Sequence, residues 1–262
     1  MQMAAVVIPR RHLPSCSPMT MELRELPMID EQARDLRSYG RRRGRKVSPR
    51  QQALWDTLLP RLRLRLEGPP PQHLAGLGAR PEGGGCSQVW LEIGFGGGEH
   101  LVWQAEQNPG TLLIGCEPFV DGVVKVLDVI EQMALGNIRI HPDDARAVLR
   151  WLPPGSIDRA FILFPDPWPK QRHRKRRLVN FETIQDLARV LRPKAELRLG
   201  TDIGDYATQM LEAVLASGAF DWQARQPADW RERPRDWPPT RYEQKAQREG
   251  RRCCYLRFLR RA

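Results

Sequence analysis

Short apolar runs alternate with amphipathic segments of helix length from residue 88 to the C-terminus. Five such runs occur, at residues 89–94, 111–117, 137–141, 158–164 and 196–201. Because parallel strands need a helical crossover between them, this alternation predicts a doubly wound α/β fold with a mostly parallel sheet. A last run, CCYLRFL at 253–259, predicts an antiparallel edge strand at the C-terminus.

Three parts of the chain differ in composition. Residues 1–35 mix Pro, Met and Arg without periodicity, so we expect a disordered extension there. Residues 36–87 form a basic leading segment with one helix, capped by Ser48 ahead of Pro49, and a Gly- and Pro-rich connection without packed elements. Residues 88–262 hold the alternating runs and are expected to form the organised domain.

The 262 residues carry a formal net charge of +11, which favours a polyanionic partner such as nucleic acid or an anionic membrane face. No apolar run reaches about 18 residues, and the first residues do not resemble a secretory leader. We therefore expect a soluble, cytoplasmic protein that does not associate with membranes. The five cysteines are odd in number and lack C-x-x-C spacing, so we expect reduced thiols and no metal site.

The stretch LEIGFGGGEHL, residues 91–101, places Gly94, Gly96 and Gly98 between a predicted strand and a predicted helix. Such a turn lets the backbone approach a ligand closely. Glu117 ends the next strand, where a carboxylate can accept hydrogen bonds from both hydroxyls of a ribose. Glu92 precedes the glycines and disfavours a phosphate, so the pattern favours a ribose-containing, cationic ligand over a dinucleotide. The remaining alternative is a tight turn without a ligand.

The stretch FPDPWPKQRHRKRR, residues 164–177, follows the fourth predicted strand. Asp166 therefore emerges at the carboxyl end of the sheet, where α/β folds bind their ligands. Trp168 can stack on a base or pack between Pro167 and Pro169, and the sequence leaves both open.

A cluster of cations completes this loop: Lys170, Arg172, Arg174, Lys175, Arg176 and Arg177. Such a cluster can neutralise phosphates, although a charge run is more often a solvated face. Its place beside the predicted crevice favours contact with RNA, as does a second basic run made of Arg41, Arg42, Arg43, Arg45 and Lys46.

Glu92, the three glycines and Glu117 resemble the cofactor loop of class I S-adenosylmethionine-dependent methyltransferases. The blocks FPDPWPKQRHRKRRLV, LGTD at 199–202 and TRYE at 240–243, in this order, resemble the bacterial tRNA (guanine-N7)-methyltransferases. RSYGRRRGR, ahead of the predicted domain, is similar to the same family's leading segment. The resemblance covers residues 36–259; the N-terminal extension and the connection EGPPPQHLAGLGARPEGGG depart from it.

The resemblance implies a Rossmann-like sheet of seven strands and makes 88–262 a methyltransferase domain that uses S-adenosylmethionine. It implies methyl transfer to N7 of a guanosine in tRNA, in the variable loop, with 7-methylguanosine as product. Two other functions stay open, namely a non-catalytic RNA-binding protein and a methyltransferase whose substrate is not RNA. The expected partner is tRNA, and we expect a monomer or homodimer without an obligatory partner subunit.

By the same resemblance, Glu92 and the glycines hold the methionine end of the cofactor, Glu117 the ribose and Asp144 the adenine amino group. S-Adenosylmethionine carries a sulfonium cation, so carboxylates suit it better than a phosphate cradle. Asp143 and Asp144 both stand where a helix begins, so one of them is alternatively its N-cap.

The resemblance makes Asp166 the active-site residue. Guanine N7 carries a lone pair and no proton, so the reaction needs alignment rather than a base. A carboxylate can provide it by accepting hydrogen bonds from guanine N1–H and the exocyclic amine. The resemblance also implies a substrate-side set: Asp202, Thr240, Arg241, Tyr242 and Glu243. Asp202 could instead cap a helix that begins near Asp205, and Tyr242 could be a half-buried aromatic residue.

Overall fold

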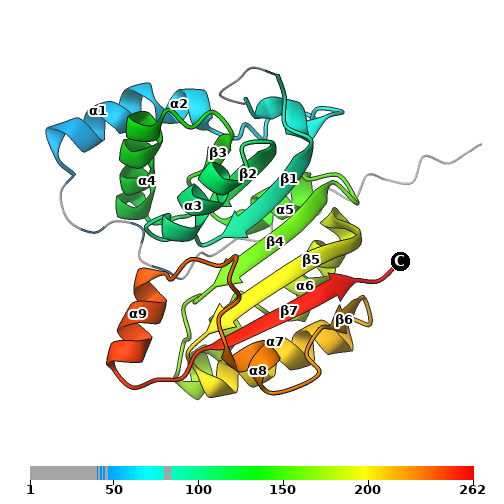
Figure 1. Ribbon diagram of the computed structural model, residues 1–262. Helices are drawn as coiled ribbons and strands as arrows, with labels where there is room; N and C mark the ends of the chain where they lie inside the picture. Colours follow the sequence, from blue (N-terminus) through cyan, green and yellow to red (C-terminus); the bar gives the residue numbers. More distant parts are fainter. Residues whose placement is uncertain (1–39, 41, 43, 45–46, 80–83) are drawn as a thin grey trace, which may run out of the picture. The chain divides into compact units, whose positions relative to one another are not determined.

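The computed structural model describes residues 40, 42, 44, 47–79 and 84–262 (Figure 1). The chain divides into two units, Met1–Asp35 and Leu36–Ala262. The predicted N-terminal extension lies outside the described residues, as does the second basic run except Arg42. The fold and the candidate site belong to the second unit.

Seven strands form one sheet in the order β3-β2-β1-β4-β5-β7-β6 (Figure 1). The strands are β1 (Gln88–Ile93), β2 (Thr111–Cys116), β3 (Ile138–His141), β4 (Ile157–Leu163), β5 (Leu191–Thr201), β6 (Phe220–Trp222) and β7 (Cys254–Arg260). β1 to β5 pair in parallel, and β7 is antiparallel to β5 and to β6. All five predicted runs are strands, so the predicted mostly parallel seven-stranded sheet is confirmed.

The C-terminal strand β7 is antiparallel, as predicted, but it lies one strand in from the edge of the sheet. β6 pairs with its last three residues, 258–260, and is the outermost strand. No sequence pattern indicated β6, because a strand of three residues is too short to show a period. Only Phe220 of β6 is buried.

Helices cover both faces of the sheet, as a doubly wound fold requires. On one face α1 (Pro49–Thr57), α2 (Leu59–Leu62), α3 (Glu99–Gln107) and α4 (Val120–Met133) contribute to one buried apolar core. On the other face α5 (Ala145–Trp151), α6 (Phe181–Val190) and α7 (Gly204–Ala216) contribute to a second core. Two further helices, α8 (Ala228–Arg231) and α9 (Arg241–Arg248), lie between β6 and β7 in the chain.

The leading segment is part of the packed fold. The side chain of Ser48 accepts a hydrogen bond from Gln51 N, Pro49 occupies the first turn, and α1 begins as predicted. The Gly- and Pro-rich connection was expected to hold no packed element, and this is wrong. Residues Leu74–Leu77 form a 3₁₀ turn. Leu74 is buried in the core to which α5, α6 and α7 contribute, because a connection rich in Gly and Pro can still bury its apolar side chains.

No helix within the described part of the chain is both long enough and apolar enough to cross a bilayer. In the same residues no group of three or more His, Cys, Asp or Glu side chains gathers as metal ligands would. The cysteines there, Cys86, Cys116, Cys253 and Cys254, are free thiols.

Candidate functional site

A cavity of about 370 Å³ opens at the carboxyl ends of the parallel strands. It lies where the strand order reverses, between β1, which is followed by β2 and β3 on one side, and β4 on the other. Doubly wound folds bind ligands at this switch point. Ten residues singled out from the sequence line it: Gly94, Gly96, Glu117, Asp144, Asp166, Trp168, Lys175, Arg176, Arg177 and Tyr242.

The glycine turn between β1 and α3 has left-handed backbone at three positions, with φ of 76° at Gly94, 55° at Gly96 and 83° at Gly98. The three glycines differ in what a side chain would meet. A Cβ on Gly94 would have no atom within 4 Å, whereas a Cβ on Gly98 would lie 2.0 Å from Cγ2 of Val126. Gly94 therefore keeps the cavity open, and Gly98 allows α4 to pack against the turn.

Glu117 connects the glycine turn to the start of α4. Its carboxylate accepts hydrogen bonds from Gly96 N at 2.7 Å and from Phe119 N at 2.9 Å. Glu117 is 7% exposed, and burial raises the pKa of its carboxyl, with smaller contributions from the negative charges of Asp166 and Glu92. A carboxylate has about four acceptor positions, so two remain for a ligand.

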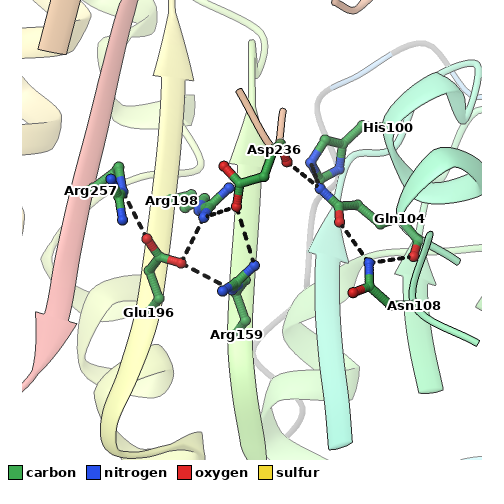
Figure 2. A network of polar contacts seen from close by, with 8 residues as sticks. All are labelled: His100, Gln104, Asn108, Arg159, Glu196, Arg198, Asp236 and Arg257. Carbon is green, nitrogen blue, oxygen red and sulfur yellow. Dashed lines mark hydrogen bonds and ion pairs between the residues drawn. The ribbon is translucent and has the colours of Figure 1, made fainter. Parts of the chain in front are cut away.

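Glu92 lies behind the glycine turn rather than in the cavity wall. It is 2% exposed, and its carboxylate accepts a hydrogen bond from Nδ1 of His100 at 2.7 Å. The side-chain amide nitrogen of Gln104 lies 3.1 Å from Nε2 of His100 and 2.9 Å from the carbonyl oxygen of Asp236 (Figure 2). Because the amide must donate to both, His100 carries its proton on Nδ1 and donates it to Glu92. Because Glu92 is buried and does not line the cavity, its direct contact with a cofactor would require the glycine turn to move.

The two aspartates after β3 have separate roles. Asp144 is the N-cap of α5 and accepts from Arg146 N at 2.9 Å; it also pairs with the Arg146 guanidinium at 2.7 Å. Burial opposes its ionisation, but Arg146 outweighs burial and holds the pKa of Asp144 below the ordinary value. Asp143 pairs with Arg42 of the leading segment. The N-cap alternative thus holds for Asp144, whose side chain still lines the cavity.

Asp166 lies at the mouth of the cavity on the loop that follows β4. Desolvation raises the pKa of its carboxyl, and none of the described residues donates a hydrogen bond to it. Phe164 and Trp168, on either side, have left-handed backbone with φ of 51° and 41°. A Cβ on Gly40 would lie 3.4 Å from the Asp166 carboxylate, so the leading segment passes close to this residue.

Trp168 faces the cavity and packs at the same time. The guanidinium of Arg176 lies 5.0 Å from its ring centre, and His173 meets the ring edge to face at 6.0 Å. Trp168 also lines the cavity. Packing and stacking on a base are therefore compatible, and the alternative posed by the sequence does not force a choice between them.

The six cations of the loop have unequal exposure, and two of them meet Asp205. Lys170, Arg172, Arg174 and Lys175 are exposed, and Arg176 is half-buried. Arg177 is 1% exposed, and its guanidinium hydrogen-bonds Pro167, Asp205 and Gln209. The contact of Arg177 with phosphate stays a prediction, and the structure encloses its charge in protein instead of exposing it. Arg174 is exposed but already pairs with Asp205 at 2.7 Å.

The substrate-side residues of the TRYE block also differ from one another: some contact only other protein groups, and one lines the cavity. Thr240 caps α9, and Arg241 pairs with Glu99 at 2.5 Å. Tyr242 is 47% exposed, lines the cavity and would meet a Cβ on Gly96 at 3.0 Å. Burial, followed by the charge of Glu117, raises the pKa of its phenol, which therefore stays protonated.

Glu243 and Asp202 do not line the cavity. Glu243 is 0% exposed, accepts a hydrogen bond from Tyr255 Oη at 2.7 Å and forms an ion pair with Arg233 at 3.0 Å. Asp202 pairs with Arg251 at 2.6 Å. The predicted cap role for Asp202 is not observed, because Ile203 occupies the N-cap position of α7. Both carboxylates therefore connect segments beside the cavity without lining it.

A network of ion pairs connects the segment ahead of α9 to the sheet (Figure 2). The Asp236 carboxylate contacts Arg198 of β5 at 2.6 Å and Arg159 of β4 at 3.8 Å. Glu196 forms ion pairs with both arginines at 3.0 Å and accepts a hydrogen bond from Arg257 of β7 at 2.8 Å. The fully buried side chain of Trp237 follows Asp236 directly. These contacts fix the start of α9 and so the position of Tyr242.

Sequence reasoning missed several residues at the cavity. Phe119, Asn180 and Thr183 line it, and the side chain of Asn180 caps α6 by accepting from Thr183 N. Gly122 lies in the first turn of α4, where a Cβ would be 2.1 Å from Gly96 O. A glycine in a helical turn was the available signal, because glycine disfavours helix unless close packing requires it.

Residues 87–256 match the family model described as "Putative methyltransferase". A tRNA (guanine-N(7)-)-methyltransferase of Rhodospirillum rubrum is 47% identical over 237 residues, which cover 89% of this chain and 91% of that protein. The protein of the same description from Caulobacter vibrioides is 51% identical over 210 residues, 80% of this chain and 89% of its own. Among solved structures, the 16S rRNA methyltransferase KamB aligns with a TM-score of 0.47 and 16% identity over 68% of this chain and 89% of that chain.

The matched range includes the glycine turn, Glu117, Asp144 and the Asp166 loop, which together form the cavity wall. The sequence relatives also extend beyond this range, to 89% of the chain. Identity near one half over most of both chains shows the family without help from the structural alignment. The chain belongs to the bacterial tRNA (guanine-N7)-methyltransferase family.

Proposed function

We propose that this chain transfers a methyl group from S-adenosylmethionine to N7 of a guanosine in the tRNA variable loop. One observation carries the proposal: the glycine turn, Glu117 and Asp166 meet in a single cavity at the switch point of the sheet. The cavity therefore offers a cofactor end and a base end side by side. The chain acts in the cytoplasm, as a monomer or a homodimer.

The residues present fit the cofactor. The space above Gly94 is open, so the methionine end can approach the backbone closely. Glu117 offers its two remaining acceptor positions to the ribose, and Asp144 lies on the same wall for the adenine. The charges of Glu117, Asp166 and Glu92 influence one another, which makes the site favourable for a cation. When bound, S-adenosylmethionine supplies the electrophilic methyl group.

At the base end, Asp166 orients guanine. Its carboxylate accepts from N1–H and the exocyclic amine, which directs the N7 lone pair and favours the cationic product. Because N7 has no proton, no residue acts as a base. Tyr242, with its protonated phenol, closes the cavity above Gly96 and can donate a hydrogen bond. Lys170, Arg172, Lys175 and Arg176 attract the phosphates beside the target base.

The two glycines give a matched pair of variants. Both Gly94→Ala and Gly98→Ala place a side chain on left-handed backbone, at a shared cost of about 1–2 kcal/mol. Gly94→Ala should lower cofactor affinity with little further loss of stability, since its Cβ enters open space. Gly98→Ala should lose roughly 1–3 kcal/mol more stability through overpacking against Val126. Calorimetric affinity and thermal unfolding of both variants check this, and equal effects on both readouts would contradict the assignment.

Incubation with labelled S-adenosylmethionine and bulk tRNA, followed by nucleoside analysis, tests the proposed function. We expect label in 7-methylguanosine. Label in another nucleoside would refute guanine N7 as the target. Tight tRNA binding without any transfer would favour a non-catalytic RNA-binding protein. Transfer to a substrate other than RNA would favour a methyltransferase that does not act on RNA.

A further inference from the structure

Arg177 has an environment unlike that of the other cations in its loop. Its Nε donates to the carbonyl oxygen of Pro167 at 2.8 Å, Nη1 to Gln209 at 2.8 Å and Nη2 to Asp205 at 2.9 Å. Its plane lies over the ring of Tyr206, 4.5 Å from the ring centre. Each of the three guanidinium nitrogens therefore has a protein partner, and with the side chain 1% exposed a phosphate could reach it only if the surrounding protein moved.

Apart from Pro167, the partners of Arg177 come from the first two turns of α7, which also form hydrogen bonds with the same loop. The Gln209 amide nitrogen donates to Val179 O at 3.2 Å, which turns its oxygen toward Arg177. The Val179 amide donates to Tyr206 Oη at 3.1 Å. The hydrogen bond from Arg177 is the main reason that the pKa of Asp205 lies below its ordinary value. Helix α7 thus holds Arg177 in one orientation.

The carbonyl that Arg177 holds is that of Pro167, the residue between Asp166 and Trp168. None of the described residues hydrogen-bonds the Asp166 carboxyl, so the backbone of its loop has a large part in directing it. That backbone has left-handed conformation at Phe164 and Trp168, which non-glycine residues disfavour. Such a conformation persists only when contacts outside it hold it in place.

We infer that Arg177, held by Asp205 and Gln209, is a positioning residue that fixes the Pro167 peptide and so directs Asp166 and Trp168 into the cavity. The inference rests on the proposed function of Asp166 as the residue that orients guanine. It assigns the last cation of the basic run to the geometry of the active loop. RNA contact is left to the cations that precede it.

Arg177→Lys tests the inference with the charge retained. A lysine ammonium is a point charge and cannot reach Pro167, Gln209 and Asp205 in the fork geometry of a guanidinium. Single-turnover methyl transfer at saturating cofactor and tRNA should fall about tenfold to a hundredfold, since small misplacements of reacting groups have effects of this size. The tRNA affinity and its salt dependence should stay as in wild type. An unchanged transfer rate in the folded variant would overturn the inference.

Asp205→Asn distinguishes a positioning role of Arg177 from a purely electrostatic one, because the two roles predict different effects on transfer. The substitution adds one net positive charge beside the basic loop, so a purely electrostatic role predicts tighter tRNA binding and normal transfer. If Asp205 holds Arg177, transfer falls severalfold although the affinity for tRNA does not weaken. Asp205 is partly exposed at the start of α7, so this variant carries the test if Arg177→Lys does not fold. Normal transfer with tighter binding would overturn the inference.

Arg172→Gln is the matched variant in the same loop. Arg172 is exposed, so loss of its charge should reduce the slope of log affinity against log salt by about 0.7–0.9. Arg177→Lys should show no such change. A slope for Arg177→Lys reduced as much as that of Arg172→Gln would show that Arg177 contacts RNA phosphates, and would overturn the inference.

Amide hydrogen exchange in the free protein gives a readout that does not depend on the reaction. The peptide covering 164–178 should exchange faster in Arg177→Lys and in Asp205→Asn than in wild type, and Arg172→Gln should match wild type. Equal exchange in all four proteins would overturn the inference. Failure of wild type to form 7-methylguanosine would instead refute the proposed function, so the two failures are distinguishable.

Discussion

Asp166→Asn is expected to lose about a hundredfold in single-turnover methyl transfer and to keep its affinity for S-adenosylmethionine. The amide retains the size of the side chain but offers one acceptor oxygen where guanine presents two donors, and it lacks the charge that favours the cationic product. A hundredfold loss corresponds to about 2.7 kcal/mol of transition-state stabilisation, similar to removing one preorganised contact. Glu182→Gln, at an exposed position in the first turn of α6, is the control and should react as wild type.

The pH dependence distinguishes orientation from base catalysis. A base would have to be deprotonated to act, whereas guanine N7 has no proton to lose, so the wild-type rate should be flat from about pH 6 to 8. Desolvation raises the pKa of Asp166, so an acid limb should begin above the ordinary range of an aspartate and should be absent in Asp166→Asn. Two results would end the orienting role: transfer at the wild-type rate in Asp166→Asn, or equal rates for tRNA whose target guanosine lacks the exocyclic amine.

The alternation of apolar runs and helix-length segments was sufficient to predict the central strands, β1 to β5. β1 to β5 are buried on both faces, and such strands show as continuous apolar runs in the sequence. β6 and the 3₁₀ turn Leu74–Leu77 were missed because each is too short for a period and depends on contacts with distant residues. β7 was predicted as the edge strand, and it lies one strand inside the edge because the unpredicted strand β6 pairs with it.

The site shows where sequence patterns stop being informative. The glycine turn and Glu117 could be predicted because residues close in sequence determine a turn and a strand end. Arg177 could not be told apart from the other cations, because its burial depends on Asp205, 28 residues further along the chain. Glu92 was identified as an important carboxylate, but its partner His100 comes from the next helix and not from a ligand. A charge in a sequence gives its sign and leaves its neighbours undetermined.

Glu117→Gln should weaken S-adenosylmethionine binding by roughly 1.5–3 kcal/mol, about tenfold to a hundredfold in affinity, which is the usual contribution of hydrogen bonds to a charged group. Gln has one acceptor oxygen, while Gly96 N and Phe119 N already require two, so one backbone donor then faces the amide NH₂. Calorimetry measures the affinity, and Glu106→Gln at an exposed position on α3 is the control. Unchanged affinity in the folded variant would remove Glu117 from the ribose site.

The stability of the same variant has a pH dependence of predictable sign. Burial raises the pKa of Glu117, so the folded protein binds this proton more tightly than the unfolded chain does. The ionised group therefore reduces stability at neutral pH, and this penalty disappears as the pH falls below the ordinary range of a glutamate. Glu117→Gln cannot titrate and lacks this dependence. The melting temperature of wild type should thus rise relative to that of Glu117→Gln as the pH is lowered from about 7 to 5. A difference in melting temperature that is constant or moves the other way would show that the Glu117 carboxyl is not held in a desolvated site.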